Sequence, residues 1–165
     1  MIYDLILVGS GFASIFFAHK ALDTGQVNRI LILERGRFHD WEWQARTRQN
    51  SLPDDHYSQL MTASGRPGKT WIFNVGVGGG ANCWWANPMR FHPNDFRVRS
   101  LYGVGVDWPL SYDDLEIYYA EAEAIMEVSG DDESGSLFPR SSPYPQPRHR
   151  FSSFARMLKD RYPDQ

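Results

Sequence analysis

The sequence contains one cysteine, Cys83, among its 165 residues. A single thiol excludes an internal disulfide framework and a metal site built from several cysteines. An excess of basic residues is also absent, because 17 Lys and Arg stand against 20 Asp and Glu, for a formal net charge of −3. The charge balance therefore gives no argument for a nucleic-acid partner or for attraction to an anionic membrane surface.

Long apolar runs are the second absence. The most apolar stretch, residues 5–18, is interrupted by two glycines, and no basic segment precedes it. A secretory signal needs a basic start, and a bilayer-spanning helix needs about 20 consecutive apolar residues. We therefore expect neither a signal peptide nor a membrane span, and a cytoplasmic location is the default expectation.

The start of the chain carries a strand, a glycine turn and a helix in that order. Residues 2–14 read I-Y-D-L-I-L-V-G-S-G-F-A-S. In such a unit, Gly9 permits the tight turn after the strand and Gly11 lets a pyrophosphate approach the backbone. Ser14 stands where a third glycine is usual and is small enough for the helix to pack close to the strand. This order predicts an α/β fold with a dinucleotide site at the turn.

The helix after this turn adds a second reason to expect phosphate binding. Its first residues, Phe12 and Ala13, present free backbone amides at the positive end of the helix dipole. The alternative is a glycine-rich turn of some other α/β protein, and the acidic residue that follows the next apolar strand argues against it.

That acidic residue is Glu34, which ends the apolar run 30–33 about 20 residues after the glycines, as ribose recognition requires. A carboxylate there accepts hydrogen bonds from ribose hydroxyls and repels a 2′-phosphate, so it favours NAD or FAD over NADP. Arg35 and Arg37 lie close by and leave the NADP alternative open.

A second glycine cluster follows at residues 76–85, which read G-V-G-G-G-A-N-C-W-W. Consecutive glycines leave backbone amides unobstructed, which suits contact with an anion or close approach of a flat ring. A plain flexible loop is the alternative. The polar and aromatic residues that follow, Asn82 and Trp84 among them, favour a binding role.

Periodicity predicts the remaining elements. Apolar runs predict strands at residues 2–8, 29–34 and 71–75. Helices are expected at 12–22, where apolar residues cover most of the circumference, at 112–127, where they recur at three-and-four spacing, and at 152–161. Residues 37–69 show no sustained period and are expected to be an irregular functional or cofactor-covering segment, with disorder as the alternative that their aromatic residues disfavour. Ser111 and Asp114 form a capping-box-like pair at the start of the 112–127 helix. We expect that helix to bury an apolar face made of Leu115, Tyr118, Ala122, Ile125 and Met126.

Taken together, the motifs resemble the N-terminal part of the glucose–methanol–choline (GMC) oxidoreductases, the FAD-dependent alcohol and sugar oxidases and dehydrogenases. The resemblance is carried, in order, by D-L-I-L-V-G-S-G-F-A-S, I-L-I-L-E-R-G, V-G-V-G-G-G-A-N-C-W-W-A-N-P-M-R-F, H-P-N-D-F and G-V-D-W-P-L-S-Y-D-D-L-E-I-Y-Y-A-E-A-E. It covers almost the whole chain, and the specificity lies in the ordered combination of motifs.

The resemblance implies a Rossmann-like FAD-binding domain of three layers around a parallel sheet, incomplete in this chain. It places the FAD pyrophosphate at Gly9, Gly11 and Ser14, and the adenosine ribose at Glu34. The pyrophosphate, ribityl chain and flavin edge would lie along Gly78, Gly79, Gly80, Ala81, Asn82 and Cys83. The implied division is an FAD-binding portion over residues 1–130, a Pro- and Ser-rich linker over 131–150 and a further segment from 151 to 165.

Cys83 falls where some members of that family carry a histidine bonded to the flavin. A cysteinyl-flavin bond is one interpretation, and a small buried thiol packed beside the ring is the other. We expect the second, with FAD held without a covalent bond.

The family's catalytic pair, a histidine with a second histidine or an asparagine, lies several hundred residues after the first glycine turn, and we expect none of the five histidines here to replace it. The resemblance thus implies an N-terminal fragment that binds FAD, lacks the catalytic base and is inactive alone. The intact enzyme would pass a hydride from an alcohol or sugar CH–OH group to FAD. The alternatives are a non-catalytic dinucleotide-binding module and an NAD-binding dehydrogenase domain. The substrate and the electron acceptor stay open.

Overall fold

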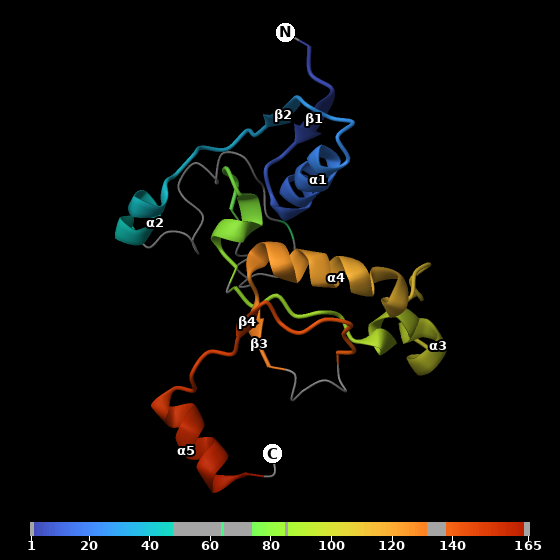
Figure 1. Ribbon diagram of the computed structural model, residues 1–165, viewed down its shortest axis with the longest axis vertical. Helices are drawn as coiled ribbons and strands as arrows, with labels where there is room; N and C mark the ends of the chain where they lie inside the picture. The colour runs from blue at the N-terminus through green and yellow to red at the C-terminus, as the bar shows by residue number, and fades with distance from the viewer. Residues whose placement is uncertain (1, 48–63, 65–73, 85, 132–137, 164–165) are drawn as a thin grey trace. The chain divides into compact units, whose positions relative to one another are not determined.

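The computed structural model describes residues 2–47, 64, 74–84, 86–131 and 138–163. The chain divides into two compact units, Met1–Asn87 and Pro88–Gln165 (Figure 1).

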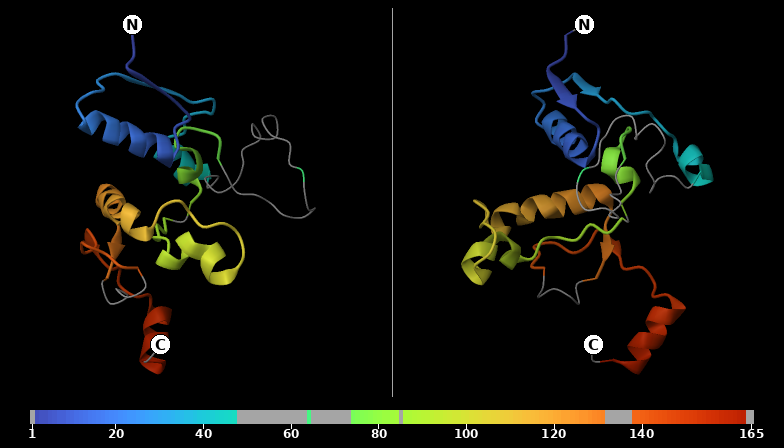
Figure 2. Two further views of the ribbon diagram at one scale, coloured as in Figure 1. Left: turned by 90° about the vertical axis from the view of Figure 1, so that its right-hand side faces the viewer. Right: turned by 180° about the vertical axis from the view of Figure 1, so that it is seen from behind.

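The first unit is built on two parallel strands joined by a helix. Strand β1 (Leu5–Val8) pairs with β2 (Ile30–Leu33), with Leu5 opposite Ile30 and Val8 opposite Leu33. The connecting helix α1 (Phe12–Asp23) lies beside the strands (Figure 2). This is the predicted strand–helix–strand order. The described residues form one two-stranded sheet here and no closed three-layer fold.

Asp4 joins the chain before β1 to the chain before β2 by hydrogen bonds. Its Oδ2 accepts hydrogen bonds from the backbone N–H groups of Asn28 and Arg29, at 3.0 and 2.9 Å. The Asp4 N–H in turn donates to the Arg29 carbonyl at 3.0 Å. The charged residue that precedes the first apolar run thus aligns the two strands.

The stretch predicted to be irregular contains a helix, α2 (Trp41–Thr47), so the prediction was wrong there. Asp40 accepts a hydrogen bond from the Trp43 N–H at 2.7 Å, and the His39 ring stacks on the Trp43 ring at 3.6 Å between centroids. These local contacts start the helix without an apolar period. Most of residues 48–69, and residues 71–73 of the strand predicted at 71–75, lie outside the described residues.

Beyond that gap, the chain returns to the end of β2. Arg37 and Gly76 form an isolated parallel bridge, and the Val77 N–H donates to the Arg37 carbonyl at 3.1 Å. A Cβ on Gly36 would lie 2.4 Å from the Gly76 Cα, so only glycine allows this backbone approach. A short 3₁₀ helix, η2 (Gly79–Asn82), follows at once.

The second unit is mainly helical (Figure 1). Its elements are η3 (Pro93–Arg97), α3 (Val98–Tyr102), α4 (Tyr112–Met126), the paired parallel strands β3 (Ser129–Gly130) and β4 (Gln146–Pro147), and α5 (Ser153–Arg161). The Ser111–Asp114 capping box at the start of α4 is confirmed: the Ser111 N–H donates to Asp114 at 2.8 Å, and the Asp114 N–H donates to the Ser111 hydroxyl at 3.3 Å.

The predicted buried face of α4 was wrong. Tyr118 and Ile125 are 52% and 48% exposed, and the other three predicted residues are half-buried. The buried positions are Tyr112 and Glu123. Glu123 is buried because Arg90, from outside the helix, forms a two-pronged ion pair with it, with both N–O distances at 2.8 Å. An ion pair, and not an apolar stripe, therefore sets the inner face of α4.

An aromatic cluster forms the core beside α4. Phe96 is 1% exposed and lies edge-on to Trp108 and Tyr112, at 5.5 and 6.3 Å between ring centroids. The Trp108 N–H also donates to the Phe96 carbonyl at 2.9 Å. Phe96 of the H-P-N-D-F motif is thus a core residue of the second unit, and Trp108 of the D-W-P motif packs on it while remaining 48% exposed.

Candidate nucleotide-binding site

The first glycine turn has the backbone geometry that phosphate binding needs. Gly9 has φ +89°, a left-handed conformation that favours glycine, and its N–H donates to the Leu33 carbonyl at 2.7 Å. A Cβ on Gly11 would meet open space, so the backbone there is accessible. Helix α1 has no side-chain cap and no acid in its first turn. Its first amides are therefore available to an anion.

Glu34 stands at the end of β2 and faces the glycine turn. Its Oε2 accepts from the Ser10 hydroxyl at 2.7 Å and the Ser10 N–H at 3.0 Å, and its Oε1 accepts from the Gly36 N–H at 2.8 Å. The Gly36 N–H, with the two Ser10 donors, holds the pKa of Glu34 below its usual value, although burial raises it. The side chain is consequently an anion with acceptor capacity left on Oε1.

A pocket of about 530 Å³ lies at the carboxyl ends of both strands. Ligands of open α/β sheets bind at this end of the strands. The pocket combines apolar side chains with one carboxylate, as expected for a site that takes an adenosine. Its lining residues are Val8, Gly9, Ile32, Leu33, Glu34 and Arg35.

The second glycine cluster packs directly against the first. Gly78 and Gly79 have φ +96° and +53°, and a Cβ on Gly79 would lie 3.5 Å from the Gly11 Cα. Asn82 holds the turn, because its Nδ2 donates to the Val77 carbonyl at 2.8 Å. Two motifs that are far apart in sequence thus form one continuous glycine-lined surface.

Cys83 lies at the end of this surface. Its Sγ lies 3.4 Å from the Gly80 carbonyl, and burial raises the pKa of the thiol. The neutral thiol is therefore the favoured form, and a thiolate is the nucleophile that a covalent flavin bond would need. Next to it, the Trp84 ring packs edge-on against Phe12 at 4.9 Å between centroids, so the residues just after η2 contact the start of α1.

The remaining predicted site residues divide by position. Gly80 and Ala81 continue the second cluster within η2. Ala13 and Ser14 lie in the first turn of α1, where Ala13 is exposed and Ser14 half-buried. Arg35 is exposed and lines the strand-end pocket.

Ser10 is the site residue that sequence reasoning missed. It is 5% exposed, its hydroxyl contacts Glu34, and the Gly78 N–H donates to that hydroxyl at 3.0 Å. The one available signal was a hydroxyl between two glycines in an otherwise apolar segment. That signal does not show that the partners lie 24 and 68 positions away.

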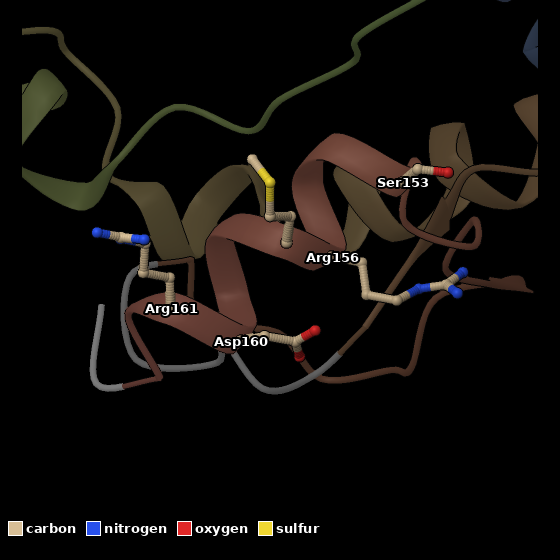
Figure 3. A pocket seen from close by; sticks show the side chains of 5 residues that line it. Ser153, Arg156, Asp160 and Arg161 are labelled. Atoms are coloured by element: carbon tan, nitrogen blue, oxygen red, sulfur yellow. The ribbon is translucent and has the colours of Figure 1, made fainter.

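A second pocket, of about 450 Å³, lies along α5 (Figure 3). Ser153, Arg156, Met157, Asp160 and Arg161 line it, all from this one helix. It contains none of the predicted site residues. Within the described ranges, no group of three or more His, Cys, Asp or Glu side chains could hold a metal ion.

Comparison with known proteins relates the chain to dehydrogenases. It is 32% identical over 169 residues to the fructose dehydrogenase large subunit of Gluconobacter japonicus, covering 86% of this chain and 30% of that protein. It is 28% identical over 145 residues to the 2-methyl-1,2-propanediol dehydrogenase of Mycolicibacterium austroafricanum, covering 77% of this chain and 25% of that protein. The chain thus spans less than a third of either relative, and both relatives are oxidoreductases by name.

No protein-family model matches the sequence. Among the described residues, no helix has the length and apolar character needed to cross a bilayer.

Proposed function

We propose that this chain is the FAD-binding portion of a GMC-type oxidoreductase that passes a hydride from an alcohol or sugar CH–OH group to FAD. The observation that carries the proposal is the meeting of the two glycine clusters beside Glu34, at the carboxyl ends of β1 and β2. Both relatives are named for substrates that contain CH–OH groups, a sugar and a diol, which supports the same donor class.

Each part of this surface suits one part of FAD. The uncapped start of α1 offers amides to the pyrophosphate, and Oε1 of Glu34 has room to accept a ribose hydroxyl. The second glycine cluster, with its open backbone at Gly80, would lie along the ribityl and flavin end. Bound FAD would supply the hydride acceptor, while the residues described here bind and orient it.

FAD is preferred over NAD because of the second glycine cluster. The first glycine turn and Glu34 serve either dinucleotide. The surface that Gly78 and Gly79 add next to Gly11 extends the site beyond what an NAD-only domain requires. A non-catalytic module that carries nucleotide without turnover would use the same residues, so activity of the longest expressed form separates it from the oxidoreductase.

Titration with FAD, NAD and NADP tests the proposal. We expect FAD to bind, with quenching or enhancement of its fluorescence, and to bind more tightly than NAD and NADP. Tight binding of NAD without FAD would contradict the proposal. Glu34→Gln should weaken the binding of FAD. Glu42→Gln, at an exposed position in the first turn of α2, should leave the affinity for FAD unchanged.

A further inference from the structure

The Ser10 hydroxyl connects the two halves of the site. It lies 2.7 Å from Glu34 Oε2 on one side and 3.0 Å from the Gly78 nitrogen on the other. The side chain is nearly fully buried. A buried hydroxyl with a partner on each side fixes the distance between those partners.

The direction of each hydrogen bond follows from what the partners can do. Ionised Glu34 is acceptor-only and the Gly78 N–H is donor-only, so the hydroxyl must donate to the carboxylate and accept from the amide. The Gly76 carbonyl, at 3.5 Å, is a more distant acceptor for the same proton. The charge on Glu34 strengthens the hydrogen bond that the Ser10 hydroxyl donates to it. This bond polarises the hydroxyl, which strengthens the hydrogen bond that Ser10 accepts from the Gly78 N–H.

A ligand that fixes Glu34 would also fix this chain of hydrogen bonds. Oε1 accepts from the Gly36 N–H and a carboxylate oxygen has two lone pairs, so a ribose hydroxyl can bind there without displacing Ser10 from Oε2. Holding the carboxylate in place holds the proton of Ser10 toward it. The Ser10 lone pair then stays directed at the Gly78 amide, at the start of the second glycine cluster.

We propose that Ser10 is a positioning residue that couples occupancy of the adenosine end, at Glu34, to the order of the second glycine cluster. Binding of the adenosine half thereby prepares the surface for the flavin half. This inference rests on the proposed nucleotide function, and it adds a named side chain through which the two half-sites communicate.

Hydrogen exchange of peptides covering residues 74–84, with and without ADP, tests the coupling in the 165-residue chain. In the wild type, ADP should slow exchange in this segment. In Ser10→Ala, ADP should still bind but should no longer slow it. Ser100→Ala is a matched control, because Ser100 donates both its hydroxyl and its N–H to Asp107 in the second unit, as Ser10 does to Glu34.

Affinities supply an independent readout. Ser10→Ala should lower FAD affinity roughly tenfold, the effect of one hydrogen bond to a charged group, and ADP affinity by less than about threefold. Equal losses for both ligands, or equal slowing of exchange by ADP in variant and wild type, would overturn the coupling. Failure of the wild type to bind either nucleotide would instead overturn the proposed function.

A second pair of variants keeps the test decisive if Ser10→Ala does not fold. Ser10→Thr retains the hydroxyl, and Ser10→Val introduces a side chain of the same shape as threonine but without the hydroxyl. Thr should preserve the slowing of exchange by ADP, and Val should lose it. Identical behaviour of the two variants would show that the hydroxyl does not carry the coupling.

Discussion

At the scale of single residues, Glu34 combines ligand recognition with folding. Its carboxylate binds the Ser10 hydroxyl and the N–H groups of Ser10 and Gly36 at the turn where the two strands end. Glu34→Ala should therefore weaken adenosine binding by about 1.5–3 kcal/mol, the scale of hydrogen bonds to a charged group. Calorimetric titration with ADP measures this, and an unchanged affinity would remove Glu34 from the ribose site.

The lowered pKa of Glu34 also makes a prediction about acid stability. Because the folded-state pKa lies below the unfolded value of about 4.3, the carboxylate stabilises the fold above that pH. This stabilisation is lost as the pH falls through the folded-state pKa. The difference in Tm between wild type and Glu34→Gln should thus shrink between pH 6 and pH 3. A constant difference over that range would contradict the prediction.

Cys83 makes the third residue-scale prediction. Burial raises the pKa of its thiol, so the thiolate is scarce near neutral pH. Acid precipitation of the FAD-loaded protein should release the flavin into the supernatant, in wild type and in Cys83→Ser alike. Yellow colour kept in the wild-type pellet and lost in Cys83→Ser would demonstrate a covalent bond.

At the scale of elements, α4 is anchored by charge. Burial disfavours the charge on Arg90, but hydrogen bonds to Glu123, Tyr112 and Glu116 outweigh it and raise the pKa of the guanidinium. The same guanidinium donates to the Pro139 carbonyl at 3.2 Å, and Glu116 accepts from the Ser141 N–H at 2.9 Å. The segment around residue 140, part of the predicted linker, is thereby attached to α4.

Arg90→Met should consequently destabilise the second unit by about 1.5–3 kcal/mol, the scale of hydrogen bonds to charged groups, because it removes one of the two arginines that pair with buried Glu123, the other being Arg140. Urea unfolding measures the change. Arg97→Met is the matched control: Arg97 is 63% exposed, and its ion pair with Asp107 has a 3.9 Å separation. Exposed pairs contribute about 0–1 kcal/mol. Similar losses in the two variants would show that the buried Arg90 cluster stabilises the fold no more than an exposed ion pair does.

These elements also show where sequence reasoning succeeds. The strand–turn–helix and the Ser111–Asp114 cap have signals within a few residues, and both were predicted. The inner face of α4 was not, because Glu123 is buried by an arginine 33 positions away. Ser10 was missed for the same reason: a hydrogen bond across 68 positions leaves no trace in local periodicity.

At the scale of the whole chain, apolar strand residues lie on the surface. Ile6 is 56% exposed and Val8 is 83% exposed, although parallel sheets are usually covered on both faces. We expect the 165-residue chain to bind the dye ANS and to associate with increasing concentration, as light scattering would show. A monodisperse monomer that does not bind ANS would contradict this.

The chain alone should also lack turnover. The resemblance places the family's catalytic residues several hundred residues after the first glycine turn, and we expect none of the five histidines to replace them. Assays with FAD, an artificial electron acceptor and a range of alcohols and sugars should give no dye reduction. Measurable reduction would place a base within these 165 residues.

The backbone contact between Gly36 and Gly76 fixes where the second glycine cluster lies, whatever the length of the segment between the two glycines. The Arg37–Gly76 bridge holds the residue after Gly36 next to the start of the second glycine cluster, although 38 residues separate them in the sequence. The entropic cost of closing a flexible loop rises by only about 0.6 kcal/mol for each doubling of its length. We therefore expect the spacing between the two glycine clusters to tolerate changes in length, whereas substitution of Gly36 or Gly76 should separate the clusters.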